Sequence, residues 1–244
     1  MNIYISIFVI IFLLNVFVLI WVYSSKKKKK IPISTITHHE TLTKADYLTL
    51  CDSSLPYVKP IRYPDILTKD ECKLLKKLST EKGFDISKVK NNEKDKTRTS
   101  ETCWLSDSDH PFLYELNERF EKLVGVEKSA FEALQVVRYY PNQSFQSHFD
   151  QCFKNEEYCQ QELQRFNGRP RDRTLIIYLN DPSEYEGGET MFDNLNVKFK
   201  EPVGTGILFE NLDESKTYVH PKAKHTGSTV ISGEKWICNL WIRS

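Results

Sequence analysis

The sequence predicts an α+β protein with a core of two β-sheets, preceded by supporting helices and one transmembrane helix. Two observations in the folded part, residues 57–244, predict this class. Residues 57–125 carry two helical patterns with clear start and stop signals. From residue 131 onward, short β-branched and aromatic runs alternate with Gly, Pro, Asn and Asp, which is typical of an antiparallel sandwich or barrel.

Composition limits the function more than the fold. The 244 residues suffice for one domain of ordinary size with an appendage, and 40% of them are hydrophobic. The 34 Lys and Arg residues balance the 33 Asp and Glu residues, so the net charge is only +1. We therefore expect no nucleic-acid partner, because no overall positive field would attract one.

The N-terminus carries a long apolar run at residues 3–23, interrupted only by Ser6 and Asn15. At about 1.5 Å per residue, a helix of this length spans roughly 30 Å, the thickness of a hydrocarbon core. A cleaved signal peptide is the alternative, but the run is too long and no positive segment precedes it. We therefore expect residues 1–25 to form a single-pass membrane anchor.

Residues 26–56 are expected to form a basic flank and a polar tether. The five lysines at 26–30 predict a cytosolic domain by the positive-inside rule. The six cysteines include no C-x-x-C motif and are also compatible with a lumenal domain. The sequence therefore does not decide on which side of the membrane the domain lies. It also does not decide whether Cys152 and Cys159 form a disulfide. The sequence does not indicate an oligomeric state.

Two helices are predicted at the start of the folded part. Thr68 and Glu71 form a capping box at the start of the first helix. Pro111 marks the first turn of the second helix, and each helix ends at a glycine. We expect the polar stretch 90–105 between them to be a loop.

The clearest candidate for chemistry is the His-x-Asp pair of His148 and Asp150. In an extended segment both side chains point to the same side, and together they suit Fe(II), Mn(II) or Zn(II). A metal centre needs a second histidine, and His220 and His225 are the candidates. We select His225, because Lys235 follows it by ten residues at the start of the last predicted strand, whereas His220 precedes a proline in a turn.

Five segments in this order resemble the prolyl 4-hydroxylase branch of the Fe(II)- and 2-oxoglutarate-dependent dioxygenases. They are "TRTSETCWL", "LQVVRYYPNQSFQSHFD", "RTLIIYLND" with "EGGETMF", "GTGILFEN" and "HTGSTVISGEKWICNLW". The resemblance covers roughly residues 60–244. It implies a double-stranded β-helix, or jelly-roll, that uses Fe(II), 2-oxoglutarate and O₂, with ascorbate as the reductant.

The resemblance also implies functions for individual residues. Lys235 would bind the distal carboxylate of 2-oxoglutarate, since a lysine buried without an anion is costly. Tyr139, nine residues before the first iron ligand, and Thr174 match further cosubstrate contacts. Arg98 and Trp241 match positions at the peptide groove. The alternatives are a β-branched strand residue for Thr174, a solvated side chain for Arg98 and a core side chain for Trp241.

These observations favour a membrane-anchored dioxygenase that hydroxylates peptidyl proline at C4 and releases succinate and CO₂. The alternatives are the same chemistry on another protein residue or on a small molecule, and an inactive tethered β-sandwich that binds a partner. The charged insertion at 151–172 lies beside the predicted iron ligands and leaves the substrate class open.

Overall fold

The computed structural model describes residues 55–87 and 97–244 of the chain. The predicted anchor and nearly all of the predicted tether lie outside these ranges, so both stay predictions. Among the residues that the structure describes, no helix is both long and apolar enough to cross a membrane.

Within these ranges the chain forms three antiparallel sheets. The largest has the order β1-β10-β6-β13-β4-β3-β2. Its strands are β1 (Ile61–Tyr63), β2 (Asp85–Ile86), β3 (Glu101–Leu105), β4 (Leu134–Tyr139), β6 (Arg171–Tyr178), β10 (Gly206–Glu210) and β13 (Lys235–Arg243). The second sheet, with the order β5-β11-β8-β9, consists of β5 (Phe145–His148), β8 (Thr190–Phe192), β9 (Val197–Phe199) and β11 (His225–Gly227). The third pairs β7 (Tyr185–Gly187) with β12 (Val230–Gly233).

Three α-helices accompany these sheets in the described ranges: α3 (Lys69–Lys82), α4 (Pro111–Val124) and α5 (Glu157–Arg165). The short 3₁₀ turns are η2 (Lys128–Ala130), η3 (Pro182–Glu184), η4 (Asp193–Leu195) and η5 (Pro221–Ala223). The predicted capping box of α3 is confirmed, because Thr68 and Glu71 each accept a hydrogen bond from the other's main-chain nitrogen. The architecture is therefore a sheet-rich α+β fold, consistent with a jelly-roll.

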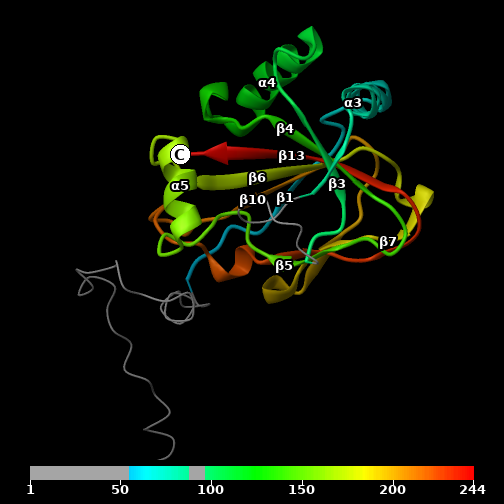
Figure 1. Ribbon diagram of the computed structural model, residues 1–244. Helices are drawn as coiled ribbons and strands as arrows, with labels where there is room; N and C mark the ends of the chain where they lie inside the picture. The colour runs from blue at the N-terminus through cyan, green and yellow to red at the C-terminus, as the bar shows by residue number, and fades with distance from the viewer. Residues whose placement is uncertain (1–54, 88–96) are drawn as a thin grey trace, which may run out of the picture. The chain divides into compact units, whose positions relative to one another are not determined.

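The largest sheet separates two apolar clusters, and only one of its faces is available for a site. Helices α3 and α4 cover one face, and the strands β5 and β7 lie on the opposite side (Figure 1). Successive side chains of β13 alternate between these faces. Those that pack toward the helices are Trp236, Cys238, Leu240 and Ile242. Lys235 and Trp241 are therefore directed to the opposite face.

The expected polar loop was wrong for residues 101–105, which form β3. This strand pairs with β4 in antiparallel register. Only Cys103 and Leu105 give it an apolar face toward the core, and Glu101 and Thr102 obscure that short pattern in the sequence. A five-residue strand with a charged start was therefore not visible from hydrophobic periodicity alone.

Replacement of Leu75 by Ala is expected to lower the free energy of unfolding by about 2–5 kcal/mol, because it leaves a cavity in a fully buried cluster. Leu74, which precedes it in α3, is a matched control because it is partly exposed. Its replacement should cost less than about 1 kcal/mol. Chemical denaturation of both variants tests this, and equal losses would contradict the placement of Leu75 in the core.

Candidate metal centre

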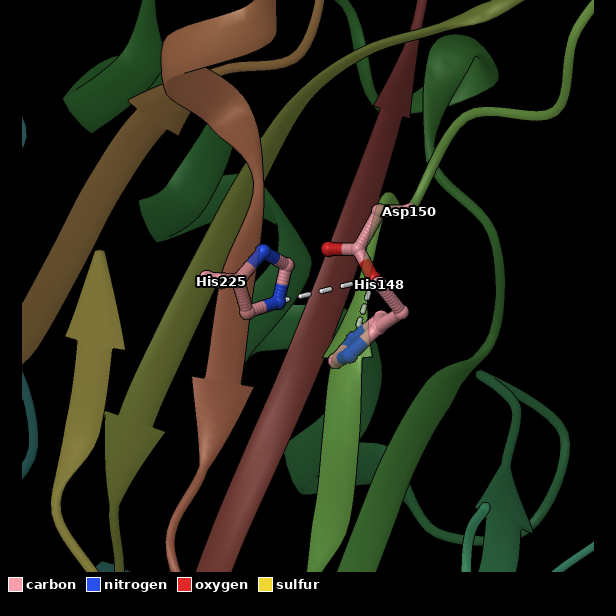
Figure 2. A group of neighbouring side chains, drawn as sticks. All are labelled: His148, Asp150 and His225. Carbon is pink, nitrogen blue, oxygen red and sulfur yellow. Dashed lines mark ion pairs between the residues drawn. The ribbon is translucent and has the colours of Figure 1, made fainter. Parts of the chain in front are cut away.

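The pairing of β5 with β11 brings together the three residues selected from the sequence. His148 ends β5, Asp150 follows two residues later, and His225 begins β11 directly opposite His148. Figure 2 shows the three side chains directed toward one another. Oδ1 of Asp150 lies 3.6 Å from Nε2 of His148 and 3.9 Å from Nε2 of His225. One ligand atom from each residue lies within 4.8 Å of the others, so the group can bind a metal ion.

Main-chain carbonyls fix the orientation of both imidazoles. Nδ1 of His148 lies 2.8 Å from the carbonyl oxygen of Gln146, and Nδ1 of His225 lies 2.9 Å from that of Ala223. Because a carbonyl only accepts, each Nδ1 of a neutral ring carries the hydrogen and donates it. Each Nε2 therefore presents a lone pair toward the centre of the group, as a metal ligand must.

The carboxylate of Asp150 is also oriented. The hydroxyl of Thr174, on strand β6 in the interior of the large sheet, donates to Oδ2 of Asp150 at 2.7 Å. Thr174 accepts in turn from the side-chain amide of Asn211 at 2.9 Å. Oδ2 is thus engaged, and Oδ1 faces the imidazoles. Thr174 orients a candidate ligand here, while its predicted contact with a cosubstrate stays a prediction.

The electrostatics favour the protonation states that metal binding requires. Burial alone would raise the pKa of Asp150, but the neighbouring imidazoles of His225 and His148 and the hydrogen bond from Thr174 outweigh burial and keep this pKa well below its ordinary value. Burial and the neighbouring His148 lower the pKa of His225 to about 4. At neutral pH the group therefore presents a carboxylate and a neutral His225 imidazole.

Aromatic rings enclose the two imidazoles. Phe145 stacks on His148 with ring centroids 3.5 Å apart. Phe192 and Phe209 lie against His225, with centroid distances of 5.4 Å and 4.9 Å. These contacts restrict the rotation of both rings.

His220 does not join this group, in agreement with the choice made from the sequence. It caps the N-terminus of η5, where its Nδ1 accepts from the main-chain nitrogen of Lys222 at 3.0 Å. Its ring packs against Tyr57, with centroids 4.5 Å apart. The contacts of His220 are those of a structural residue.

Lys235 is a buried cation at the start of β13, only 2% exposed. Its Nζ lies 3.5 Å from the hydroxyl of Thr190 and faces the rings of Tyr139 and Tyr178 at 5.5 Å and 5.9 Å. Among the described residues, no carboxylate forms a salt bridge with it. Burial lowers the pKa of Lys235 to about 7. A buried lysine without a counter-ion fits a site for an anionic ligand.

The other predicted site residues lie on the same side of the large sheet. Tyr139 is 4% exposed and pairs with Lys235 across β4 and β13. Arg98 is buried, not solvated, and its guanidinium lies 4.8 Å from the centroid of the Phe145 ring. Trp241 is also buried, and the guanidinium of Arg171 lies 3.7 Å from its ring centroid.

A buried ion-pair cluster lies beside this site and was not predicted from the sequence. Arg171 and Arg243 both donate to Oε1 of Glu132, at 2.6 Å and 2.8 Å. Arg171 also donates to the main-chain oxygen of Asp150 at 3.2 Å. The available signal was the presence of charged residues inside or next to predicted β-strands, which indicates buried pairing.

Comparison with known proteins agrees with this geometry. Residues 134–243 match the 2OG-Fe(II) oxygenase superfamily. A protein of Acanthamoeba polyphaga mimivirus, provisionally named a prolyl 4-hydroxylase, is 35% identical over 188 residues, which cover 77% of this chain and 75% of that protein. Prolyl 4-hydroxylase subunit alpha-1 of Rattus norvegicus is 29% identical over 187 residues, 75% of this chain and 34% of that subunit.

A solved structure is also similar. The viral collagen prolyl hydroxylase of Paramecium bursaria Chlorella virus-1, in complex with 2-oxoglutarate, superimposes with a TM-score of 0.61. It is 29% identical, and the similarity covers 77% of this chain and 97% of that one. The family match, residues 134–243, includes all three residues of the candidate metal centre.

Replacement of Thr174 by Val is expected to weaken metal binding by about tenfold, because outer contacts of this kind orient a ligand. Thr174→Ser is the matched control, since it keeps the hydroxyl that donates to Asp150. Titration of both variants with Co(II), followed by visible absorption, measures the affinity. Equal affinity for the Val and Ser variants would show that the hydroxyl does not orient the carboxylate.

Proposed function

The chain belongs to the 2OG-Fe(II) oxygenase superfamily, in its prolyl 4-hydroxylase branch, and from this premise we propose that it hydroxylates C4 of proline residues in a peptide or protein. Its cofactor is Fe(II), its cosubstrates are 2-oxoglutarate and O₂, and ascorbate is the typical reductant of prolyl hydroxylases. The observation that carries the proposal is the opposed pair of His148 and His225 with Asp150, on the side of the large sheet toward which buried Lys235 is directed.

We propose that Nε2 of His148, Nε2 of His225 and Oδ1 of Asp150 bind the iron. Two imidazoles and one carboxylate are the ligand set of non-haem Fe(II) oxygenases, and they leave coordination positions open for other ligands. With 2-oxoglutarate and O₂, the bound iron supplies the oxidising power that replaces a C–H hydrogen by a hydroxyl, while 2-oxoglutarate is converted to succinate and CO₂. The surrounding rings and strands orient the ligands within a jelly-roll and limit access by water.

The positive charge of Lys235 supports a binding site for 2-oxoglutarate beside it. Lys235 is buried without a carboxylate partner in the described part of the chain, so the distal carboxylate of 2-oxoglutarate would supply the missing anion. Thr190, 3.5 Å from Nζ, would donate a second hydrogen bond to the same carboxylate. Tyr139 lies opposite Lys235 and lines this position.

A proline-containing chain is the substrate that we propose for the same face. Arg98 and Trp241 would contact it, and Trp241 packs against Trp104, whose side chain is 41% exposed, with ring centroids 5.6 Å apart. The two indoles thus connect the buried site to the surface. Proline-rich peptides adopt an extended polyproline II helix without internal hydrogen bonds, and its rings stack well on such aromatic surfaces.

Incubation with Fe(II), ascorbate, 2-oxoglutarate and a Pro-Pro-Gly repeat peptide is expected to release succinate and to add the mass of oxygen to the peptide. His225→Ala should abolish both, because it removes a proposed iron ligand. The control is His220→Asn, which keeps an acceptor for the nitrogen of Lys222 and should retain activity. Mass spectrometry and a succinate assay provide the measurements.

Each result separates one alternative. Succinate release that never depends on a peptide would favour a small-molecule substrate. Modification of another residue in the peptide would change the target but not the chemistry. No succinate with any substrate, in protein that binds iron, would leave only a binding module, and loss of activity in His220→Asn alone would contradict the ligand assignment.

Binding of 2-oxoglutarate is expected to weaken as the pH rises through about 7. Burial lowers the pKa of Lys235 to about 7 in the free protein, and a bound dicarboxylate would raise it by favouring the charged form. Binding therefore takes up a proton above pH 7, and the affinity should fall about tenfold per pH unit there. Calorimetry with Mn(II) under nitrogen measures this without turnover.

Lys235→Ala provides the comparison. It should weaken 2-oxoglutarate binding and remove this pH dependence while the affinity for Mn(II) is unchanged. A wild-type affinity that stays constant from about pH 6 to about pH 9 would contradict the assignment of Lys235 as the carboxylate partner.

A further inference from the structure

Asp150 differs from the two histidines in how the fold positions it. His148 and His225 lie opposite each other in paired strands, so the β5–β11 ladder fixes both main chains. Asp150 follows the end of β5 and has no strand partner in the described residues. A carboxylate on a bend needs other contacts to stay in place, because metal affinity depends on ligands that are oriented beforehand.

The next residue, Gln151, supplies such contacts from a buried position, only 3% exposed. Its Oε1 accepts from the main-chain nitrogen of Arg171, the first residue of β6, at 2.7 Å. Its Nε2 donates to the carbonyl of Cys152 at 3.0 Å. The same Nε2 lies 3.3 Å from Sγ of Cys152 and 3.7 Å from Sγ of Cys159. The amide therefore connects the Asp150 bend to β6 and to both of these sulfur atoms.

Those sulfur atoms form the Cys152–Cys159 disulfide, which answers the question left open by the sequence. Cys159 is a fully buried residue of α5. The helix is attached to the C-terminal strand, because Glu162 accepts from the guanidinium of Arg243 at 2.7 Å. The disulfide thus ties the residues after Asp150 to a helix that is itself fixed to β13.

Two side chains of strand β6 also donate hydrogen bonds directly to Asp150. The guanidinium of Arg171 donates to the main-chain oxygen of Asp150 at 3.2 Å, and the hydroxyl of Thr174 donates to its Oδ2 at 2.7 Å. With the bond that Gln151 accepts from the main-chain nitrogen of Arg171, three hydrogen bonds connect residues 150 and 151 to one strand. They fix the main chain and the carboxylate of Asp150 at the same time.

Apolar side chains secure the other side of the segment. Phe149 and Phe153 pack edge to face, with ring centroids 5.4 Å apart. Phe153 belongs to a small buried cluster with Leu212 and Val219, and Phe149 packs against it. His148 and Asp150 point to the metal centre. Phe149 between them and Phe153 after them instead pack in the cluster with Leu212 and Val219, which secures the main chain on either side of Asp150.

From these contacts we propose that the 151–172 insertion positions Asp150 for metal binding, with Gln151 as the positioning residue and the Cys152–Cys159 disulfide as its support. This inference rests on the proposed function, because it requires a metal ion at the triad. The insertion acts as a fixed part of the metal centre, not as a lid that opens for substrate. Loss of the amide or of the disulfide leaves the two histidines in place and frees only the carboxylate.

The test measures Co(II) affinity of the full chain by visible absorption, under nitrogen and without 2-oxoglutarate, so that it does not depend on activity. Gln151→Met keeps the volume of the side chain and removes its hydrogen bonds, and it should weaken binding by about tenfold or more. The double variant Cys152→Ser, Cys159→Ser should show a similar loss. Substitution is preferred to chemical reduction, because dithiols bind transition metals.

Gln161→Met is the matched control, since Gln161 is an exposed residue of α5 and should leave the affinity unchanged. The unfolding temperature of each metal-free variant is measured on the same preparation. A purely structural function of Gln151 would lower that temperature and leave the Co(II) dissociation constant as in the wild type, which would overturn the inference.

The outcomes also distinguish this inference from the proposed function. If the wild type itself fails to bind Co(II), the proposed function fails and the inference fails with it. If the wild type binds and Gln151→Met binds equally well, only the inference is overturned. An unchanged affinity in the double cysteine variant overturns the part assigned to the disulfide, and if that variant does not fold, Gln151→Met alone decides.

Discussion

The antiparallel pairing of β5 with β11 determines where the metal centre forms, because its register sets His148 opposite His225. Carbonyl oxygens of the same chain segments then orient both rings, so that each Nε2 faces inward. Asp150 reaches the same point from the end of β5, and β6 fixes it from the large sheet. The site therefore lies between the two sheets and requires both.

Burial gives this region its chemical character. The neighbouring histidines and the hydrogen bond from Thr174 outweigh burial and keep the pKa of Asp150 low, so the carboxylate is charged in a place that is costly for an isolated anion. Lys235 is a buried basic group, and burial lowers its pKa because the described residues offer no carboxylate that would pair with its charged form. A bound metal ion would balance the charge of Asp150, and a bound dicarboxylate would balance that of Lys235. The two buried groups thus specify a cation and an anion on the same side of the large sheet, which agrees with iron and 2-oxoglutarate.

The sequence predicted the local parts of this site better than the distant ones. His148 and Asp150 were visible because their spacing lies within one extended segment, and Lys235 because it begins an apolar strand. The contacts of Arg171 were not visible, because its partner Glu132 is 39 residues away and no spacing rule joins them. Strand β3 was missed for a related reason: its pattern is too short to be recognised without β4 beside it.

An anaerobic crystal structure of the protein with Mn(II) and 2-oxoglutarate would show both proposed binding sites at once. We expect one metal ion bound by Nε2 of His148, Nε2 of His225 and a single oxygen of Asp150. We also expect the distal carboxylate of 2-oxoglutarate to contact Nζ of Lys235. A metal ion bound elsewhere, or a 2-oxoglutarate molecule whose distal carboxylate lies away from Lys235, would contradict these assignments.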